Sequence, residues 1–416
     1  MLSLRPDVDE GSLLGGHDVR LLQGGDELFP AMIAAIAGAQ RSVWLATYIF
    51  HDDESAQAVA QALREAGVRG VRVAVVVDGF GSKATLARLH EWLPEPQVAL
   101  TVFRPVDSWW SLLQPGQLRR LHQKLCVVDG EIGFVGGINL IDDRNDLRLG
   151  RAELPRLDFA VSLRGPMVAA VEQAASAIWR RAQFGIEWRE EMLALARSTE
   201  PLAQARRMVR GLRMSTRELP APTPQPMRAA FLVRDNLRRR RSIEQAYIRA
   251  ILRARESVEI ICPYFYPGRV FRHALRAAAR RGVRVRLLLQ GKIDYRFAAL
   301  AAQVLYDEML ADGVRIYEYT PAFLHAKVAL VDGDWATVGS SNIDPLSLLL
   351  NLEANVIVRD AGFSAVLRQR FEAAVAESRE VTAPPAGQGA WAVLRRAAVA
   401  WAAHWALRMA GLSGRY

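Results

Sequence analysis

Two stretches of the chain repeat one pattern of residues that could carry out chemistry. The first reads LHQKLCVVDGEIGFVGGINL and the second reads LHAKVALVDGDWATVGSSNI. The shared residues are His122, Lys124, Asp129 and Asn139 in the first copy, and His325, Lys327, Asp332 and Asn342 in the second. Composition alone predicts far less than one chance copy of the histidine–lysine–aspartate spacing. The two copies therefore indicate a shared role.

The spacing of the histidine and the lysine favours phosphate chemistry. Residues two apart in an extended strand point to the same face, so each imidazole and its lysine project together. Lysine and asparagine side chains suit the non-bridging oxygens of a phosphodiester and the charge that develops on them. One histidine would attack phosphorus while the other protonates the leaving oxygen. Neither a carboxylate cluster nor a Cys/His spacing indicates a metal, and we expect no metal ion and no cofactor.

The two aspartates of the pattern allow two interpretations. Asp129 and Asp332 each end an expected apolar strand and could belong to the catalytic set. Each stands five residues beyond its lysine, and an odd spacing faces the opposite side of a strand. We therefore favour a structural role for both.

Composition limits the classes of protein that fit. The chain has 416 residues and a formal net charge of +10, which favours anionic partners such as nucleic acid, acidic lipid or phosphorylated substrates. Two cysteines exclude a disulfide framework and a four-cysteine zinc site. No signal peptide and no run of apolar residues long enough to span a membrane is evident. These features favour the cytosol or a surface that faces it.

The chain also repeats itself around the two motifs. Residues 39–50 read AQRSVWLATYIF and residues 254–265 read ARESVEIICPYF, and each stretch predicts a buried strand after a helix. In both copies, a glycine then ends a helix and a second buried strand begins. The motif itself is expected inside a third strand. Helices that alternate with apolar strands predict an α/β fold built from two similar lobes, each with a central sheet.

Proline-rich breaks suggest the domain boundaries. LPAPTPQPM cannot hold a helix or a central strand, and APPAGQG precedes a final stretch rich in tryptophan and arginine. The sequence predicts a first lobe at residues 1–200, a linker at 201–227, a second lobe at 228–380 and an amphipathic tail at 381–416.

The paired motifs resemble the two HKD motifs of the phospholipase D superfamily. VGSSNIDPLSLLLNLEANV at 338–356 and RRGVRVRLLLQG at 280–291 look like the corresponding stretches of the bacterial cardiolipin synthase B family. The resemblance implies two phospholipase D-like α-β-α lobes that share one active site at their interface. It implies that His122 becomes phosphorylated and that His325 serves as acid and then base.

The same resemblance implies roles for the neighbouring polar residues. The phosphate-binding residues would be Lys124, Lys327, Asn139, Asn342 and Ser340. A downstream acidic residue would steady each histidine; the matching positions are Asp158 and Glu353. The first lobe has Gly137 where the second has Ser340, so the lobes are not equivalent.

The implied reaction is phosphatidyl transfer without a metal ion. A donor such as phosphatidylglycerol would form a phosphatidyl-histidine, which the glycerol hydroxyl of another phospholipid would then attack to give cardiolipin. The second substrate could be phosphatidylglycerol or phosphatidylethanolamine. Three alternatives remain at this stage: phospholipase D-type hydrolysis, a metal-independent nuclease, and a non-catalytic protein that binds anionic surfaces. Two intact motifs argue against the last, and a lipid-directed tail makes nucleic acid the less favoured substrate.

Two tryptophan-rich segments predict contact with an anionic membrane surface. Trp109 and Trp110 lie in an expected loop before the first motif, and Trp391, Trp401 and Trp405 recur at helical spacing in the tail. The uncharged part of the tail is too short to span a bilayer but suits an interfacial helix. The alternatives are a loop that packs on its own lobe and a helix that packs on the core. We expect a peripheral protein on the cytoplasmic face of the inner membrane; the sequence does not determine its oligomeric state.

Overall fold

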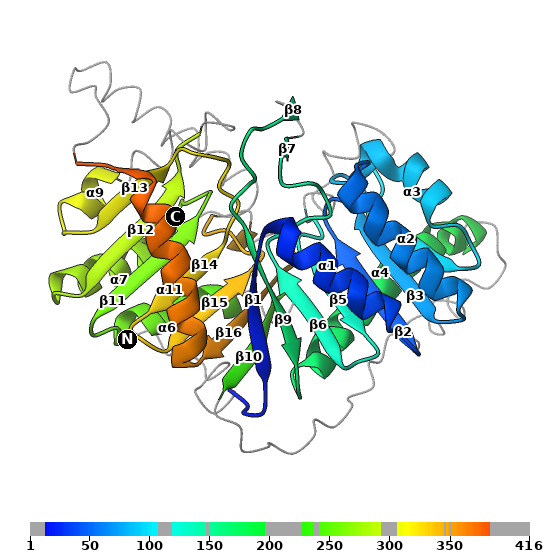
Figure 1. Cartoon of the computed structure of the whole chain (residues 1–416), viewed down its shortest axis with the longest axis horizontal. Coiled ribbons are helices and arrows are strands. Elements are labelled where there is room, and N and C mark those ends of the chain that lie inside the picture. The colour runs from blue at the N-terminus through cyan, green and yellow to red at the C-terminus, as the bar shows by residue number, and fades with distance from the viewer. Residues whose placement is uncertain are drawn as a thin grey trace.

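The molecule contains two mixed sheets, each flanked by helices on both faces (Figure 1). The computed structural model describes residues 13–106, 119–146, 150–195, 227–235, 241–292, 306–344, 347–348 and 351–382. Within these residues, no helix is long and apolar enough to cross a membrane.

The first lobe runs from β1 to α4. Its elements are β1 (Asp18–Gln23), α1 (Gly24–Ala37), β2 (Ser42–Thr47), α2 (Glu54–Val68), β3 (Arg72–Asp78), the 3-10 helix η2 (Lys83–Thr85), α3 (Leu86–Trp92), β4 (Val98–Phe103), β5 (Leu125–Val128), β6 (Ile132–Gly136), β7 (Asn145–Asp146), β8 (Gly150–Arg151), β9 (Phe159–Arg164) and α4 (Val168–Leu195).

The second lobe runs from β10 to β17. Its elements are β10 (Arg228–Arg234), α6 (Ser242–Arg253), β11 (Ser257–Cys262), α7 (Arg269–Arg280), β12 (Arg284–Gln290), α9 (Tyr306–Leu310), β13 (Arg315–Tyr319), β14 (Val328–Val331), β15 (Trp335–Gly339), β16 (Glu353–Arg359), α11 (Ala361–Ala376) and β17 (Ser378–Glu380).

The two large sheets repeat one strand order. The first is β1-β9-β6-β5-β2-β3-β4, and the second is β10-β16-β15-β14-β11-β12-β13 with β17 added at the edge. In the first sheet, β2 pairs in parallel with β3 and antiparallel with the motif strand β5. In the second sheet, β11 pairs in the same way with β12 and with the motif strand β14. The predicted α/β fold of two similar lobes is confirmed.

Glycines end the repeated helices where the sequence places them. Gly70 follows α2 with a φ of 88°, and Gly282 follows α7 with a φ of 89°. This left-handed conformation is one that glycine adopts without the steric cost borne by other residues. In each lobe the chain then enters a strand with one exposed residue followed by a buried run, as an interior parallel strand requires.

The lobes share one hydrophobic core. It includes Val135 and Val161 of the first sheet, Val338 and Val356 of the second, and Leu367 of α11. Strands β6 and β9 contact β15 and β16, α4 contacts β10, and α11 contacts β1. Just before β1 the chain even pairs with the other lobe, because Leu14 forms a bridge with Ala229. A continuous core holds the lobes in a set relation, which is what a site between them needs.

The expected position of the motifs within the sheets is wrong by a few residues. His122 and Lys124 precede β5, which begins at Leu125, and His325 and Lys327 precede β14, which begins at Val328. The chain is extended there but pairs with the other lobe instead of its own sheet: Leu121 bridges Leu352, and Leu157 bridges Leu324. The predicted linker and most of the predicted tail lie outside the described residues, so those boundaries stay predictions.

Candidate active site

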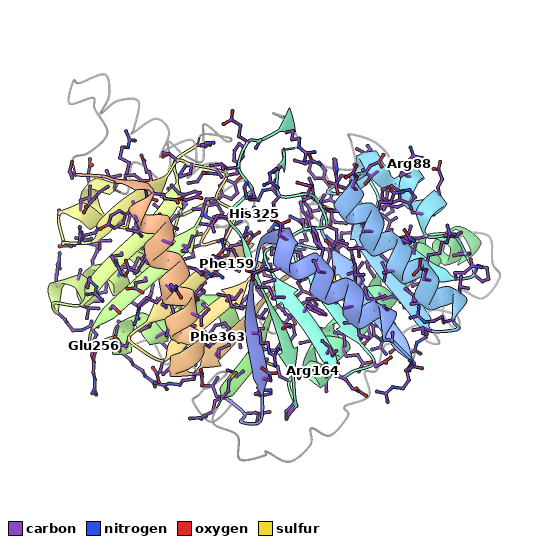
Figure 2. All side chains as sticks on the ribbon, in the orientation of Figure 1. Arg88, Phe159, Arg164, Glu256, His325 and Phe363 are labelled. Carbon is purple, nitrogen blue, oxygen red and sulfur yellow. The ribbon has the colours of Figure 1, made fainter. Side chains whose placement is uncertain are left out.

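The two motifs meet where each lobe extends a short segment across to the other. His122 N–H donates to the Leu352 carbonyl at 3.0 Å, and Leu352 N–H donates to the Arg120 carbonyl at 2.9 Å. The other crossing is equivalent, because His325 N–H donates to the Leu157 carbonyl at 2.9 Å. Figure 2 places His325 between the two sheets, above the core residue Phe159. Backbone hydrogen bonds therefore position both histidines at the boundary of the lobes.

Each histidine is held by a carboxylate of the opposite lobe. The Nδ1 atom of His122 lies 3.0 Å from Oε2 of Glu353, and Nδ1 of His325 lies 2.6 Å from Oδ2 of Asp158. Both carboxylates are almost fully buried. A carboxylate on Nδ1 fixes the ring orientation and leaves Nε2 for chemistry. The resemblance implies an acid downstream of each histidine in its own lobe; both acids are at the site, but each contacts the histidine of the other lobe.

The two lysines of the motifs are buried beside the histidines. Lys124 is 6% exposed and Lys327 is 1% exposed. Lys124 Nζ donates to the His122 carbonyl at 2.8 Å, and Lys327 Nζ donates to the His325 carbonyl. Buried lysines are rare without a compensating anion. An ammonium group has three donors, so one bond to a carbonyl leaves capacity for phosphate oxygens.

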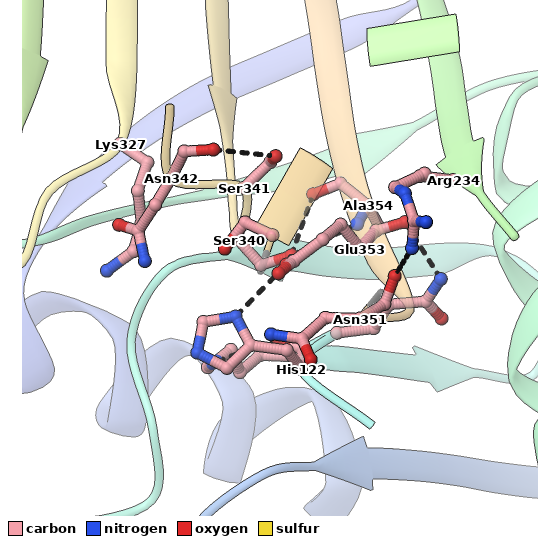
Figure 3. A network of polar contacts seen from close by, with 12 residues as sticks. His122, Arg234, Lys327, Ser340, Ser341, Asn342, Asn351, Glu353 and Ala354 are labelled. Carbon is pink, nitrogen blue, oxygen red and sulfur yellow. Dashed lines mark hydrogen bonds and ion pairs between the residues drawn. The ribbon is translucent and has the colours of Figure 1, made fainter. Parts of the chain in front are cut away.

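The asparagines lie on the turns that follow the motif strands. Asn139 Oδ1 accepts from the Ile49 N–H at 3.2 Å, which orients its amide. Asn342 is also buried, and its Oδ1 has no partner among the described residues. Ser340 points elsewhere: its hydroxyl donates to Glu353 Oε2 at 2.6 Å, in the chain of contacts that reaches His122 (Figure 3). Ser340 therefore supports a carboxylate, and the phosphate-binding role predicted for it is not the one its contacts describe.

The two histidine–carboxylate pairs differ in their electrostatics. Burial lowers the pKa of His122, and Lys124 adds to this effect while Glu353 opposes it. Burial alone would raise the pKa of Glu353, but His122, Lys124 and Ser340 outweigh it and lower that pKa. Burial raises the pKa of Asp158 to about 7 against the opposing charge of Lys327, and burial holds the pKa of His325 well below its ordinary value. Near neutral pH, Glu353 is therefore the more readily ionised of the two acids, whereas the Asp158 carboxyl is about half protonated.

At both lysines, the effect of burial on the pKa outweighs that of the nearby carboxyl groups. Burial lowers the pKa of Lys124 to about 7, and nearby Lys327 adds to the effect. Burial also lowers the pKa of Lys327 to about 8. A bound anion would raise both pKa values, because an opposite charge favours the ammonium form. The site therefore suits a phosphate group between the two lysines.

The aspartates of the motifs lie at the other end of their strands. Asp129 follows β5, has a φ of 55°, and accepts the N–H groups of Gln40, Arg41 and Ser42 at 2.7–2.8 Å. Asp332 follows β14, has a φ of 53°, and accepts three equivalent N–H groups ahead of β11. An aspartate tolerates this left-handed conformation and bonds locally. These contacts match the structural role that the sequence favoured, and we leave both residues out of the catalytic set.

Tyr48 also lies at the site, although its sequence pattern did not predict a functional role. The centroids of the Tyr48 and His122 rings are 5.2 Å apart, and Lys124 Nζ lies 5.5 Å from the Tyr48 centroid. Alignment of the repeated strands puts Pro263 at this position of the second lobe. This difference between the two copies is the sequence feature that could have pointed to Tyr48.

Other predicted contacts fall outside the described residues. They are Trp109, Trp110, Trp391, Trp401 and Trp405. In the part of the chain that the structure describes, no group of three His, Cys, Asp or Glu side chains is placed to hold a metal ion.

Two crossed histidine–carboxylate pairs on a duplicated α/β fold define a phospholipase D-like protein. The model of the family described as "Cardiolipin synthase, PLD-like domain" matches residues 32–149 and 247–375. The chain is 35% identical to cardiolipin synthase B of Escherichia coli strain K12, over 87% of this chain and 81% of that protein. It is 37% identical to cardiolipin synthase B of Salmonella typhimurium strain LT2, over 86% and 80% respectively. This chain belongs to the cardiolipin synthase family of phospholipase D-like proteins.

A solved structure supports the fold. The crystal structure of phosphatidylserine synthase from Haemophilus influenzae Rd KW20 aligns with a TM-score of 0.64 at 14% identity. The alignment covers 94% of this chain and 93% of the other. At that identity the match speaks for the fold alone.

Proposed function

We propose that this protein transfers a phosphatidyl group from phosphatidylglycerol to the glycerol hydroxyl of a second phospholipid and so makes cardiolipin. Family membership supports the class of enzyme, a phosphatidyltransferase of the phospholipase D type. The observation that carries the proposal is the convergence of two crossed histidine–carboxylate pairs and two buried lysines on one location.

In the first step, His122 Nε2 attacks the phosphorus atom of the donor. The bond from phosphorus to the headgroup oxygen breaks, and His325 gives that oxygen a proton. Lys124, Lys327, Asn139 and Asn342 hold the non-bridging oxygens as negative charge grows on them. The product of this step is a phosphatidyl group on His122 and a free alcohol.

In the second step, the acceptor hydroxyl attacks the same phosphorus atom. His325 takes the proton of that hydroxyl, the bond from phosphorus to His122 breaks, and the enzyme returns to its starting state. Passage through one intermediate predicts ping-pong kinetics, and water in place of the acceptor would give hydrolysis.

The different surroundings of the histidines support this order of roles. Burial and the charge of Lys124 favour a neutral His122 ring, and Glu353 at Nδ1 orients that ring so that its Nε2 lone pair can attack. The Asp158 carboxyl, with a pKa of about 7, keeps a proton within the His325 pair that can pass to the leaving oxygen. The nucleophile is therefore assigned to the first lobe and the acid to the second.

We place the reaction at the surface of the inner membrane, on its cytoplasmic face. The support is the sequence of the two tryptophan-rich segments together with the lipid nature of the proposed substrates. Removal of the chain from Trp391 onward should reduce co-sedimentation with phosphatidylglycerol vesicles; retention of full binding would contradict this placement.

The test of the function uses the purified protein and vesicles of defined composition. Phosphatidylglycerol vesicles, with and without phosphatidylethanolamine, are incubated with the protein and the lipid products are identified by mass. We expect cardiolipin, with phosphatidic acid as the product of competing water. His122→Ala should abolish both products, and His273→Ala, an exposed histidine of α7, is the matched control. No phosphatidyl product from the wild-type protein would remove the proposal.

A further inference from the structure

Four arginines of the first lobe lie near one another, and one of them, Arg120, stands two residues before His122; Arg104, Arg119, Arg120 and Arg181 are here called the arginine cluster. Arg120 Nη1 donates to the Arg104 carbonyl at 3.1 Å, and Arg104 Nη1 donates to the Arg119 carbonyl at 3.1 Å. The guanidinium carbons of Arg104 and Arg181 lie 5.4 and 6.0 Å from the centroid of one ring, that of Phe103. The guanidinium groups of Arg104 and Arg181 therefore lie close together, and the charges of Arg119 and Arg120 also act on Arg104.

The cluster carries more positive charge than its surroundings balance. Burial lowers the pKa of Arg104 to about 10, and the charges of Arg181, Arg119 and Arg120 add to this effect. Among the residues that the structure describes, two carboxyl groups oppose them: Asp78, whose Oδ1 lies 3.7 Å from Arg120 Nη1, and Asp235, whose charge acts on Arg181. Asp78 already accepts the N–H groups of Phe80, Gly81 and Leu121. In the described part of the chain, four cations therefore face two carboxyl groups, a balance that favours an anion.

A buried, unpartnered donor points in the same direction. Arg120 is 8% exposed, yet its Nη2 makes no hydrogen bond with the residues that the structure describes. A charged donor that is removed from water without an acceptor costs free energy. A planar guanidinium group suits phosphate oxygens in particular.

The cluster is close to the reacting atoms. Arg120 stands two residues before His122 in a segment whose backbone bonds to Leu352 on both sides of Leu121. Arg120, His122 and Lys124 thus alternate along an extended chain, and two residues of such a chain span about 7 Å. That length is comparable with a glycerol unit that carries a phosphate at each end.

The second lobe shows that the fold does not require these arginines. Its motif has Phe323 in the place of Arg120, and Thr320 follows β13 where Arg104 follows β4. Gln290 ends β12 where Asp78 ends β3, and each side chain accepts the N–H of the leucine before the motif histidine, at 3.4 Å for Gln290 and 2.9 Å for Asp78. The backbone contact is kept, whereas Arg104 and Arg120 have no arginine counterpart there; the second lobe has one lysine instead, Lys292, whose Nζ lies 6.0 Å from the Phe323 ring and donates to the Pro321 carbonyl.

We propose that the arginine cluster is a second phosphate-binding site, which holds the phosphate of the acceptor while His122 and His325 act on the phosphate of the donor. The inference rests on the proposed function, because it assigns the acceptor of that same reaction. The acceptor class is a glycerol unit that has a free hydroxyl at one end and a phosphate at the other. Both the phosphatidylglycerol headgroup and soluble glycerol phosphate belong to this class. The cluster favours such acceptors over water and uncharged alcohols.

The test separates the donor step from the choice of acceptor. Vesicles of phosphatidyl-p-nitrophenol serve as the donor, and release of p-nitrophenol reports the first step. Phosphatidylglycerol, sn-glycerol 3-phosphate or glycerol is then added, and the products are identified by mass. The variants are Arg181→Gln and Arg104→Gln. Arg180→Gln, the neighbouring exposed arginine whose Nε bonds to its own helix, is the matched control.

Glutamine is chosen because Arg104 has a φ of 51°, where a β-branched residue would be strained. Arg120 is left in place because its burial makes a folding defect the expected result of its removal.

We expect each variant to lower transfer to the two phosphate-bearing acceptors about tenfold, which corresponds to one lost charge-assisted contact. Release of p-nitrophenol and transfer to glycerol should stay within about twofold of wild type. A loss confined to phosphatidylglycerol would identify the lipid headgroup as the source of the phosphate, and an equal loss with sn-glycerol 3-phosphate would show recognition of phosphate alone.

Two results would overturn the inference. Equal losses with all three acceptors, or no loss with any, would show that the cluster does not bind the acceptor phosphate. In both cases wild-type transfer would leave the proposed function intact. Absence of any transfer by the wild-type protein would remove the proposed function and this inference together.

Discussion

The two lobes have the same sheet and the same motif, yet they surround their histidines differently. His122 faces Glu353, which also receives the Ser340 hydroxyl, whereas His325 faces Asp158, which has Gly137 at the equivalent position. A side chain does not fit there: a Cβ on Gly137 would lie 2.4 Å from Asp158 Oδ1. The shorter acid takes the space of the serine and loses its hydrogen bond. One histidine therefore faces a carboxyl whose pKa is lowered, and the other faces a carboxyl whose pKa is raised.

The two lobes also differ in the charged side chains at the positions around their motifs. The first lobe places Arg120 and Arg104 beside its histidine, while the second lobe places Phe323 and Thr320 there. Duplication gives two equivalent backbones, and side-chain differences at a few positions then give each histidine its own task. The division of labour between nucleophile and acid can be tested at those positions.

The largest expected effect separates the two histidines by leaving group. His122→Ala should reduce release from both phosphatidylglycerol and phosphatidyl-p-nitrophenol by at least about 10⁴-fold, because no intermediate forms. His325→Ala should reduce release of glycerol by about 10³-fold but release of p-nitrophenol by about tenfold or less, because a good leaving group needs no proton. The rate of the first turnover, followed as a burst of alcohol release, measures both, because later turnovers also need His325 as the base of the second step. The reverse pattern would exchange the roles of the lobes.

The pH dependence should show the same difference. Asp158, with a raised pKa of about 7, holds a proton below that pH, and the His325 pair loses it as the pH rises. Release of glycerol should therefore fall about tenfold for each pH unit above 7, while release of p-nitrophenol should not. Loss of charge from Lys124, whose pKa is also about 7, would slow both donors equally. A parallel decline for the two donors would assign the effect to the lysine and contradict the prediction.

A smaller effect is expected where the lobes differ by one hydroxyl. Ser340→Ala removes the hydrogen bond to Glu353 and should raise the pKa of that carboxyl, since one of its stabilising donors is lost. We expect kcat to fall about tenfold, in line with one hydrogen bond to a charged group. Ser341→Ala, whose hydroxyl donates to the Asn342 carbonyl at 3.2 Å, is the control. Equal activity of the two variants would show that Ser340 does not act through Glu353.

The smallest effect on chemistry is expected at the motif aspartates. Asp129→Ala removes the acceptor of three N–H groups, which lie a strand's length from His122, and should lower the free energy of unfolding by about 2 kcal/mol. Denaturant unfolding measures this loss. The kcat of the folded enzyme should stay within about twofold of wild type. A large fall in kcat at unchanged stability would return Asp129 to the catalytic set.

Much of the molecule could be predicted from local patterns. The repeated strands, the helix ends at Gly70 and Gly282, and the matched motifs predict a duplicated α/β fold. These features follow from local rules, because strand burial, helix termination and side-chain alternation depend on residues close in the chain. The identities of Asp158 and Glu353 came from resemblance to a family, since nothing in their local spacing marks an acid that orients a histidine.

Other features arise only when distant segments meet. The crossed pairing of His122 with Glu353 and of His325 with Asp158 depends on two short bridges between the lobes, and neither bridge has a local signature. The shifted pKa values need the burial that the shared core provides, and the arginine cluster joins residues of the chain as far apart as Arg104 and Arg181. Local sequence specifies which groups exist and which face they share. Their distances, partners and dielectric surroundings depend on long-range packing. These quantities determine the pKa of each group and where an anion can bind.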